Sequence, residues 1–320
     1  MDAPRDRGRG LIAPPGSPFL IVNPRSGDDE PSAEELVAEA ERRGIDTHVL
    51  GREDDVAAIA RERAESGVRV LGMAGGDGSL GAVAGEALEH DVPFVCVPFG
   101  TRNHFARDLG LDCDDPVSVL DAFRGGEERR VDVGTVDGRV FLNNVSLGLY
   151  ASLVHHPGHD TKNRLVAALR MIPAAFGKSR RPLDLMVEVE GRMERRSALV
   201  LLVANNDYAL DAISDLGRRT RLDEGCLHAY VVEAVGRWRL VGLFARALSG
   251  RIDRTKGWVE WTSKRFEVAA KRHRAHVAID GEPDVLTPPL VLEIRPRALR
   301  VLIPAGTNSR DAEPNAPADN

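Results

Sequence analysis

Three glycines and an aspartate stand together in Gly75-Gly76-Asp77-Gly78-Ser79, directly after an apolar run. Glycine lets the backbone turn tightly and approach a ligand closely, so that amide N–H groups and the start of a following helix can bind phosphate. Asp77 would then lie beside a polyphosphate, which is unfavourable unless a divalent cation bridges the two groups. The segment therefore predicts a nucleoside triphosphate site with Mg²⁺ held by Asp77. A Gly-rich turn in which Asp77 only caps the helix is the alternative.

Alternating elements surround this segment. Residues 18–23 are apolar and predict a buried strand, and residues 32–43 predict a helix because Ser32 and Glu35 stand in capping-box spacing. Such alternation with short connections predicts an open, mostly parallel, Rossmann-like α/β sheet, whose ligands bind at the carboxyl ends of the strands. The remaining strands are expected at 46–50, 68–73 and 93–98, and the remaining helices at 53–66, 79–89, 102–109 and 115–124.

The pattern changes near Arg130. Segments 131–136 and 139–146 flank an Asp137-Gly138 turn and predict a hairpin, as do 183–190 and 195–204 around a second turn. We therefore predict a mainly β, sandwich-like second domain. We place the α/β nucleotide-binding domain at 17–130 and the β-rich acceptor domain at 131–304, with the last strand returning to the first domain. Disordered ends are expected at 1–16 and 305–320, and further strands at 226–233, 257–261, 264–270, 275–279 and 290–302.

The bulk composition limits the classes of protein. A chain of 320 residues suffices for two domains, and it holds no run of apolar residues long enough for a spanning helix. Its three scattered cysteines favour reduced thiols, so we expect a cytoplasmic protein. A net charge of −6 and 5% aromatic residues argue against nucleic-acid binding. The second half is nevertheless basic, which suggests an anionic partner such as nucleotide phosphates or a membrane surface.

Four motifs follow one another in a specific order. Asn23-Pro24-Arg25-Ser26-Gly27, the Gly75–Ser79 segment, Pro98-Phe99-Gly100-Thr101-Arg102-Asn103 and Ala278-Ile279-Asp280-Gly281-Glu282 resemble the motifs of diacylglycerol kinase catalytic domains. The resemblance spans residues 18–304 and extends to sphingosine and ceramide kinases and, more distantly, to NAD kinases. It implies an NAD kinase/diacylglycerol kinase-like fold, ATP and Mg²⁺ as cofactors, and a lipid substrate at a membrane surface.

The resemblance also implies roles for individual residues. Asp280 would be the general base that accepts the proton of the attacking hydroxyl, and Glu282 would support it or touch the substrate. An ordinary Asp-Gly hairpin turn is the alternative for this dipeptide alone. The cofactor-binding residues predicted in this way are Asn23, Ser26, Gly75, Gly76, Asp77, Gly78, Ser79, Thr101 and Asn103.

A second metal is implied by the segment 221–227, which is similar to the Asp-Asp-Gly stretch that holds a structural magnesium in this superfamily. Glu224 replaces the aspartate nearest the glycine. Glutamate can still bind a hard cation through oxygen, but its longer side chain changes the geometry. An exposed acidic turn is the alternative.

Three functions remain open from the sequence. The first is a lipid kinase, peripheral to the inner face of the membrane, with its acceptor groove near residues 150–181. In this hypothesis the basic side chains face anionic head groups; they are Arg164, Arg170, Lys178, Arg180 and Arg181. The second is an NAD kinase or sugar kinase, although the Asn-acid pair common in NAD kinases has only Asn143-Asn144 as its nearest counterpart. The third is a non-catalytic nucleotide- or lipid-binding module.

Several observations weigh on this choice. His104 after Asn103 and Ala82 in place of the usual acid depart from the family pattern, whereas Asp77 and Asp280 are retained. The histidines at 155, 156 and 159 suit either a metal site or a solvated loop. An exposed edge in the β domain would allow a homodimer.

Overall fold

The computed structural model describes residues 16–26, 31–148, 183–189, 192–208, 219, 221–233, 258–269 and 273–307. Several predictions lie outside these residues. They are most of the disordered ends predicted at 1–16 and 305–320, Gly27 of the first motif, the predicted acceptor segment 150–181 with its basic side chains, and the histidines at 155, 156 and 159.

Four parallel strands form the sheet of the first half. The strands β1 (Pro18–Val22), β2 (Asp46–Val49), β3 (Val70–Gly75) and β4 (Phe94–Pro98) lie in the order β2-β1-β3-β4. Every residue of β1, β3 and β4 is buried, as expected for central strands covered on both faces. The predicted α/β alternation and parallel sheet are therefore confirmed.

The helices of this half begin at residues that satisfy their first amide groups. In α1 (Ala33–Arg42) the Ser32 hydroxyl accepts from the Glu35 amide, and the Glu35 carboxylate accepts from the Ser32 amide, so the predicted capping box is present. Asp55 caps α2 (Val56–Glu65). The helix α3 (Asp77–Glu89) begins two residues before the predicted start, and its N-cap Gly76 offers no side-chain cap. The first amide groups of α3 are thus not capped by the side chain of its N-cap residue.

Shorter helical elements follow β4. The helix α4 (His104–Asp108) lies within the predicted range 102–109. The single helix predicted at 115–124 is instead a 3₁₀ turn, η1 (Ser118–Asp121), followed by the short α5 (Ala122–Gly125). Among the described residues, no helix is both long and apolar enough to cross a bilayer.

The second half is built from antiparallel strands. Its pairs include β8 (Leu183–Val189) with β9 (Arg192–Asn205), β10 (Leu227–Glu233) with β11 (Trp258–Ser263), and β13 (Ala275–Ile279) with β14 (Glu282–Leu286). The buried apolar side chains of this half form a core of their own, separate from the core of the α/β half. The remaining strands are β5 (Glu127–Val136), β6 (Arg139–Phe141), β7 (Asn144–Gly148), β12 (Arg265–Ala269) and β15 (Leu290–Ile303).

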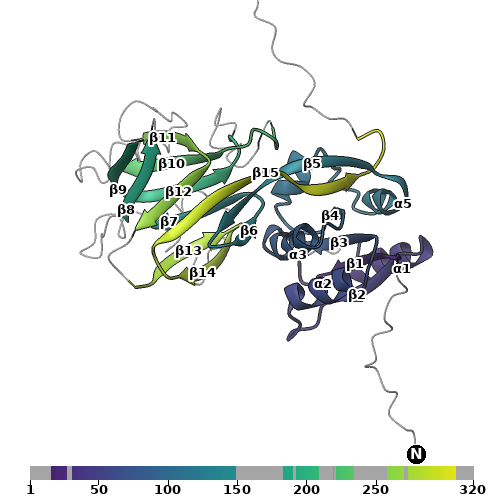
Figure 1. Ribbon diagram of the computed structural model, residues 1–320. Coiled ribbons are helices and arrows are strands. Elements are labelled where there is room, and N and C mark those ends of the chain that lie inside the picture. Colours follow the sequence, from purple (N-terminus) through teal and green to yellow (C-terminus); the bar gives the residue numbers. More distant parts are fainter. Residues whose placement is uncertain are drawn as a thin grey trace, which may run out of the picture.

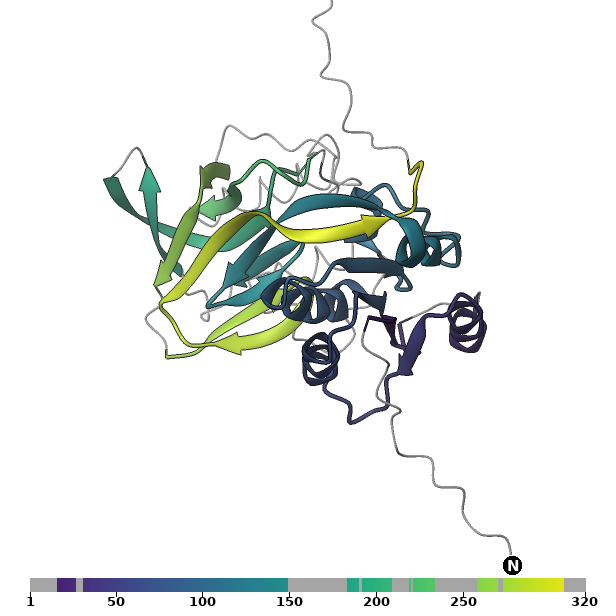
Figure 2. The same cartoon turned by 45° about the vertical axis from the view of Figure 1, so that its right-hand side comes forward.

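The long strand β15 belongs to both halves. Its first residues pair with β12, most of its length pairs with β5, and Val301 pairs with Phe94 of β4. Figures 1 and 2 both show this strand, drawn in yellow, passing from the β-rich half along β5 toward the α/β half. The sheet is consequently continuous from β14 to β2. The predicted boundary near residue 130 falls inside β5, and the domain limits remain a prediction.

One predicted strand is interrupted. Residues 139–146 were expected to be continuous, but β6 ends at Phe141 and β7 begins at Asn144. The backbone N–H groups of Leu142 and Asn143 donate to the Asp280 carboxylate, and the Leu142 carbonyl accepts from two side chains. These backbone groups therefore bind side chains in place of a neighbouring strand.

Candidate active site

The carboxyl ends of three parallel strands bring the first three motifs together. Gly100 follows β4 and packs against Gly76, which follows β3: a Cβ added at Gly100 would lie 2.7 Å from Gly76 Cα. From the end of β1, the Asn23 side-chain amide donates to Ser79 Oγ at 3.4 Å. A Cβ added at Gly76 would lie 3.9 Å from Ser26 Oγ. The structure thus groups the predicted cofactor-binding residues at one edge of the sheet.

The turn after β4 is held by Asn103. Its φ of 49° lies in the left-handed region, and its side-chain oxygen accepts from the Gly100 amide at 2.8 Å. Asn103 is buried, whereas Thr101 in the same turn is exposed. Asn103 therefore shapes the turn, and Thr101 is available to a ligand.

Asp77 lies at the centre of these segments and is buried. Its Oδ1 accepts from the Phe105 amide at 3.2 Å and from the Asn143 side chain at 3.1 Å, and its Oδ2 accepts from the His104 amide at 3.3 Å. Asp77 therefore does cap a helix, but the helix is α4 and not its own. All three donors are neutral, and a carboxylate has room for further partners, so the group fits the predicted Mg²⁺ ligand.

Asp280 and Gly281 form a two-residue turn between β13 and β14. Their φ values are 48° and 88°, and Ile279 pairs with Glu282, as in a type I′ hairpin. The Asp280 carboxylate accepts three backbone N–H groups: Leu142 at 2.8 Å on Oδ2, and Asn143 at 2.7 Å and Asn144 at 3.1 Å on Oδ1. These hydrogen bonds hold the turn against Leu142 and Asn143, which connect β6 to β7.

The environment of Asp280 shifts its acidity. Burial raises its pKa to about 7, although the amide donors of Leu142, Asn143 and Asn144 lower it, and the nearby charge of Asp77 adds to the rise. A carboxyl with a pKa near neutrality can both accept and release a proton under physiological conditions.

The β13–β14 hairpin packs directly on the first turns of α3. A Cβ added at Gly81 would lie 3.1 Å from Asp280 Oδ2, and one added at Gly78 would lie 2.1 Å from Glu282 Cγ. Only glycine at position 78 allows this approach. The structure therefore brings Asp280 and Glu282, which lie about 200 residues further along the chain, next to the predicted phosphate-binding segment.

Two residues that carried no predicted role complete the site. Asn143, considered only as a counterpart of an NAD kinase motif, joins Asp77 through its side chain and Asp280 through its backbone. Arg219 is fully buried together with Asp108 and donates to it at 2.7 Å, and it also donates to Asn143 Oδ1 at 2.8 Å. Nothing in the neighbouring sequence distinguishes Arg219, because its partners come from distant segments.

Glu224 lies elsewhere, in the turn before β10. Its carboxylate accepts from the Asp207 amide at 3.1 Å and lies 3.2 Å from His228 Nε2. Its role as a ligand of a second magnesium stays a prediction.

Comparisons with known proteins point to one group of kinases. The family model described as "Diacylglycerol kinase catalytic domain" matches residues 17–136, and the one described as "YegS C-terminal NAD kinase beta sandwich-like domain" matches residues 158–303. The chain is 23% identical over 275 residues to the diacylglycerol kinase of Bacillus subtilis (strain 168), covering 82% of this chain and 88% of that protein. It is 28% identical over 301 residues to "Probable lipid kinase YegS-like" of Pseudomonas aeruginosa (strain UCBPP-PA14), covering 90% and 94%.

Solved structures show the same fold. The crystal structure of a diacylglycerol kinase from Bacillus anthracis str. Sterne superposes with a TM-score of 0.64 at 16% sequence identity, covering 91% of this chain and 98% of that one. The two matched models follow one another along the chain, the first over the α/β half and the second over the β-rich half. Most of the chain is therefore similar to this family of kinases: a match to the diacylglycerol kinase catalytic domain is followed by a match to the YegS C-terminal sandwich-like domain.

Proposed function

We propose that this chain is an ATP-dependent lipid kinase, which transfers the γ-phosphoryl group of ATP to a hydroxyl of a diacylglycerol-like or related lipid at a membrane surface. The observation that supports this most is the position of Asp280, whose Oδ2 faces Gly81 in the second turn of α3. A carboxyl with a near-neutral pKa thus lies next to the segment predicted to bind the nucleotide phosphates.

The phosphates would bind at the start of α3. Gly76 contributes no side-chain cap, so backbone N–H groups and the positive end of the helix dipole can face an anion. Asn23 and Ser26 border the same segment from the end of β1. Asp77 would hold Mg²⁺, which supplies charge neutralisation for the phosphates when bound.

Asp280 would act as the general base. When the lipid hydroxyl oxygen attacks the γ-phosphorus, the bond to the ADP oxygen breaks and the hydroxyl proton passes to the carboxylate. Oδ2 accepts only the Leu142 amide among the described contacts, so one of its lone pairs remains for that proton. The three amide donors keep the carboxylate oriented while it does so.

The test is transfer of label from γ-labelled ATP into an organic-extractable product, with Mg²⁺ and a panel of lipids in mixed micelles. Asp280→Asn should abolish the transfer and leave nucleotide binding nearly unchanged. Asp284→Asn is the matched control: it removes a carboxylate from the same hairpin, where Asp284 pairs with the exposed Arg139. Label in NAD rather than in a lipid, label in no acceptor, or full activity of Asp280→Asn would each contradict the proposal.

A further inference from the structure

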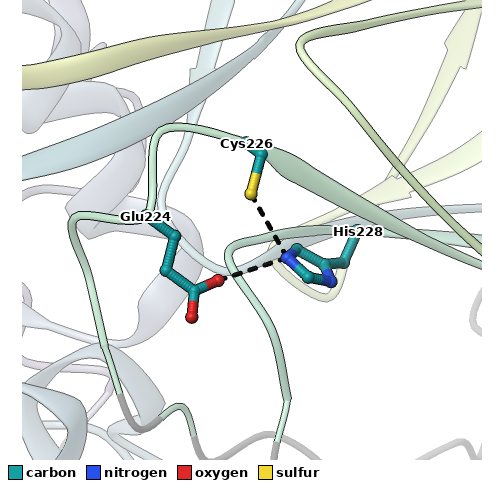
Figure 3. Close-up of side chains that lie close together, drawn as sticks. All are labelled: Glu224, Cys226 and His228. Carbon is teal, nitrogen blue, oxygen red and sulfur yellow. Dashed lines mark hydrogen bonds and ion pairs between the residues drawn. The ribbon is translucent and has the colours of Figure 1, made fainter. Parts of the chain in front are cut away.

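Three side chains with metal-binding atoms converge at the start of β10. Glu224 and Cys226 lie in the bend before β10, on either side of Gly225 with its φ of 72°, and His228 is the second residue of the strand. Figure 3 shows them pointing toward one another. His228 Nε2 lies 3.2 Å from Glu224 Oε2 and 3.3 Å from Cys226 Sγ. All three are half-buried, and their ligand atoms lie within 4.8 Å of one another.

The two separations from His228 Nε2, to Cys226 Sγ and to Glu224 Oε2, are close to those of ligands around a tetrahedral ion. Zinc–sulfur and zinc–nitrogen bonds of about 2.3 and 2.1 Å, at a tetrahedral angle, place sulfur and nitrogen about 3.6 Å apart and nitrogen and oxygen about 3.4 Å apart. The observed distances to His228 Nε2 are within a few tenths of an ångström of these values. An ion bound to His228 Nε2 and to either of these neighbours would therefore require only small side-chain movements.

The second ring nitrogen of His228 also has polar neighbours. Its Nδ1 lies 3.5 Å from Asp207 Oδ1 and 3.5 Å from Thr262 Oγ1. Asp207 is itself fixed, because the Tyr230 hydroxyl donates to its Oδ1 at 2.5 Å. A histidine that binds a metal through one nitrogen usually donates its other N–H to a carboxylate. This arrangement directs the lone pair of Nε2 toward Glu224 and Cys226.

The same residues do not suit the structural magnesium implied by the resemblance. Magnesium prefers oxygen ligands in octahedral geometry, whereas Glu224 is accompanied here by a thiol and an imidazole. The neighbouring Asp223 is engaged by Arg297 at 2.6 Å and Arg221 at 3.1 Å, and Arg297 in particular lowers its pKa. Thiol and imidazole ligands favour zinc-like ions instead.

We propose that Glu224, Cys226 and His228 bind one divalent transition-metal ion of the Zn²⁺ class, with water in the fourth position. Binding displaces the thiol proton of Cys226 to solvent and forms a metal–thiolate bond. The proposal is independent of the lipid kinase activity.

The bound ion would stabilise the junction of the two halves. The turn that carries Glu224 is attached to β5, because the Gly225 amide donates to Asp132 Oδ2 at 2.6 Å. On the other side, Asp207 precedes Tyr208, whose hydroxyl accepts from the Asn144 side chain at 2.8 Å. Asn144 in turn donates its backbone N–H to Asp280. A metal at His228 would thus fix the segment next to the proposed base.

The first experiment is a Co²⁺ titration of the full, tag-free, metal-free chain, followed by absorption spectroscopy. One equivalent should produce the near-ultraviolet thiolate-to-cobalt band and the visible bands of tetrahedral Co²⁺. Cys226→Ser should lose the thiolate band. Cys113→Ser should keep it, because Cys113 is the other half-buried free thiol. Absence of the band in the wild type, or its persistence in Cys226→Ser, would overturn the proposal.

The second experiment separates metal binding from folding. Zn²⁺ should raise the thermal midpoint of the wild type and of Cys113→Ser, and it should not raise that of His228→Gln. Asp207→Asn leaves the three ligands in place but weakens the support of the imidazole, so its affinity for Zn²⁺ should fall about 10- to 100-fold. The proposed zinc site would be refuted if Mg²⁺ raised the thermal midpoint as much as Zn²⁺ does. It would also be refuted if His228→Gln and Asp207→Asn both kept the zinc affinity of the wild type.

Discussion

Gly100→Ala tests whether the contact between the turn after β4 and the predicted phosphate-binding segment is needed for stability and for ATP binding. The new Cβ would lie 2.7 Å from Gly76 Cα, 3.0 Å from Asn103 Oδ1 and 3.2 Å from Gly76 N. Two of these three atoms are backbone, so no side-chain rotation relieves the clash. We expect the variant to push Gly76 and the start of α3 away from β4.

The magnitude follows from two opposing effects. Overpacking of this kind lowers the free energy of unfolding by about 1–3 kcal/mol. Replacing glycine by alanine raises it by about 0.4–1 kcal/mol, because alanine reduces the conformational entropy of the unfolded chain. The difference predicts a net loss of up to about 2.6 kcal/mol in the free energy of unfolding. If the displaced loop loses about 1.4 kcal/mol of phosphate contact, the dissociation constant of the nucleotide rises about tenfold.

The assay combines urea unfolding with calorimetric measurement of ATP binding in the presence of Mg²⁺. Gly85→Ala is the matched control: it lies within α3, and its added Cβ would meet only Val140 at 3.6 Å. Better helix propensity should make this control more stable by up to about 1 kcal/mol. If Gly100→Ala binds ATP as tightly as Gly85→Ala does, Gly76 is not part of the nucleotide site.

Three further predictions follow from the site. The folded state raises the pKa of Asp280 from 3.8 to about 7, so between these values the folded chain holds a proton that the unfolded chain has lost. The contribution of Asp280 to the free energy of unfolding should therefore decrease as pH rises through that window and level off above it. Urea unfolding measured against pH should show this slope in the wild type and not in Asp280→Asn, and turnover of the wild type should increase through pH 7. Asp77→Ala should weaken ATP binding much more with Mg²⁺ than without it, and equal weakening in both titrations would assign Asp77 to helix capping alone. Arg219→Met leaves Asp108 buried without its partner and should lower the free energy of unfolding by about 3–5 kcal/mol. The double variant Arg219→Met/Asp108→Leu should recover much of this loss. If its denaturant midpoint shows no recovery, the broken ion pair is not the cause.

Much of the first half could be predicted because its signals are local. The capping box of Ser32 and Glu35, the apolar run at 18–23 and the glycines at 75–78 each contain within a few residues the groups that determine the structure. Parallel topology then places the ends of the strands together.

The rest of the site depends on partners that are distant in sequence. Leu142 and Asn143 look like strand residues, and only the carboxylate of Asp280, more than 130 residues later, withdraws their amides from the sheet. Arg219 becomes a central residue because Asp108 and Asn143 surround it in space. Glu224 is a different case, because its neighbours Cys226 and His228 are close in sequence, and its role as a magnesium ligand stays a prediction.

The position of β15 has a consequence for synthesis on the ribosome. The strand occupies residues 290–303, yet it covers the edge of β4 near residue 94 and pairs along β5. Until β15 has left the exit tunnel, the nascent α/β half exposes the unpaired edge of β4 and part of its apolar core. Folding of the first half to completion must therefore wait until β15 has been synthesised, and the growing chain is a candidate for chaperone binding during that interval.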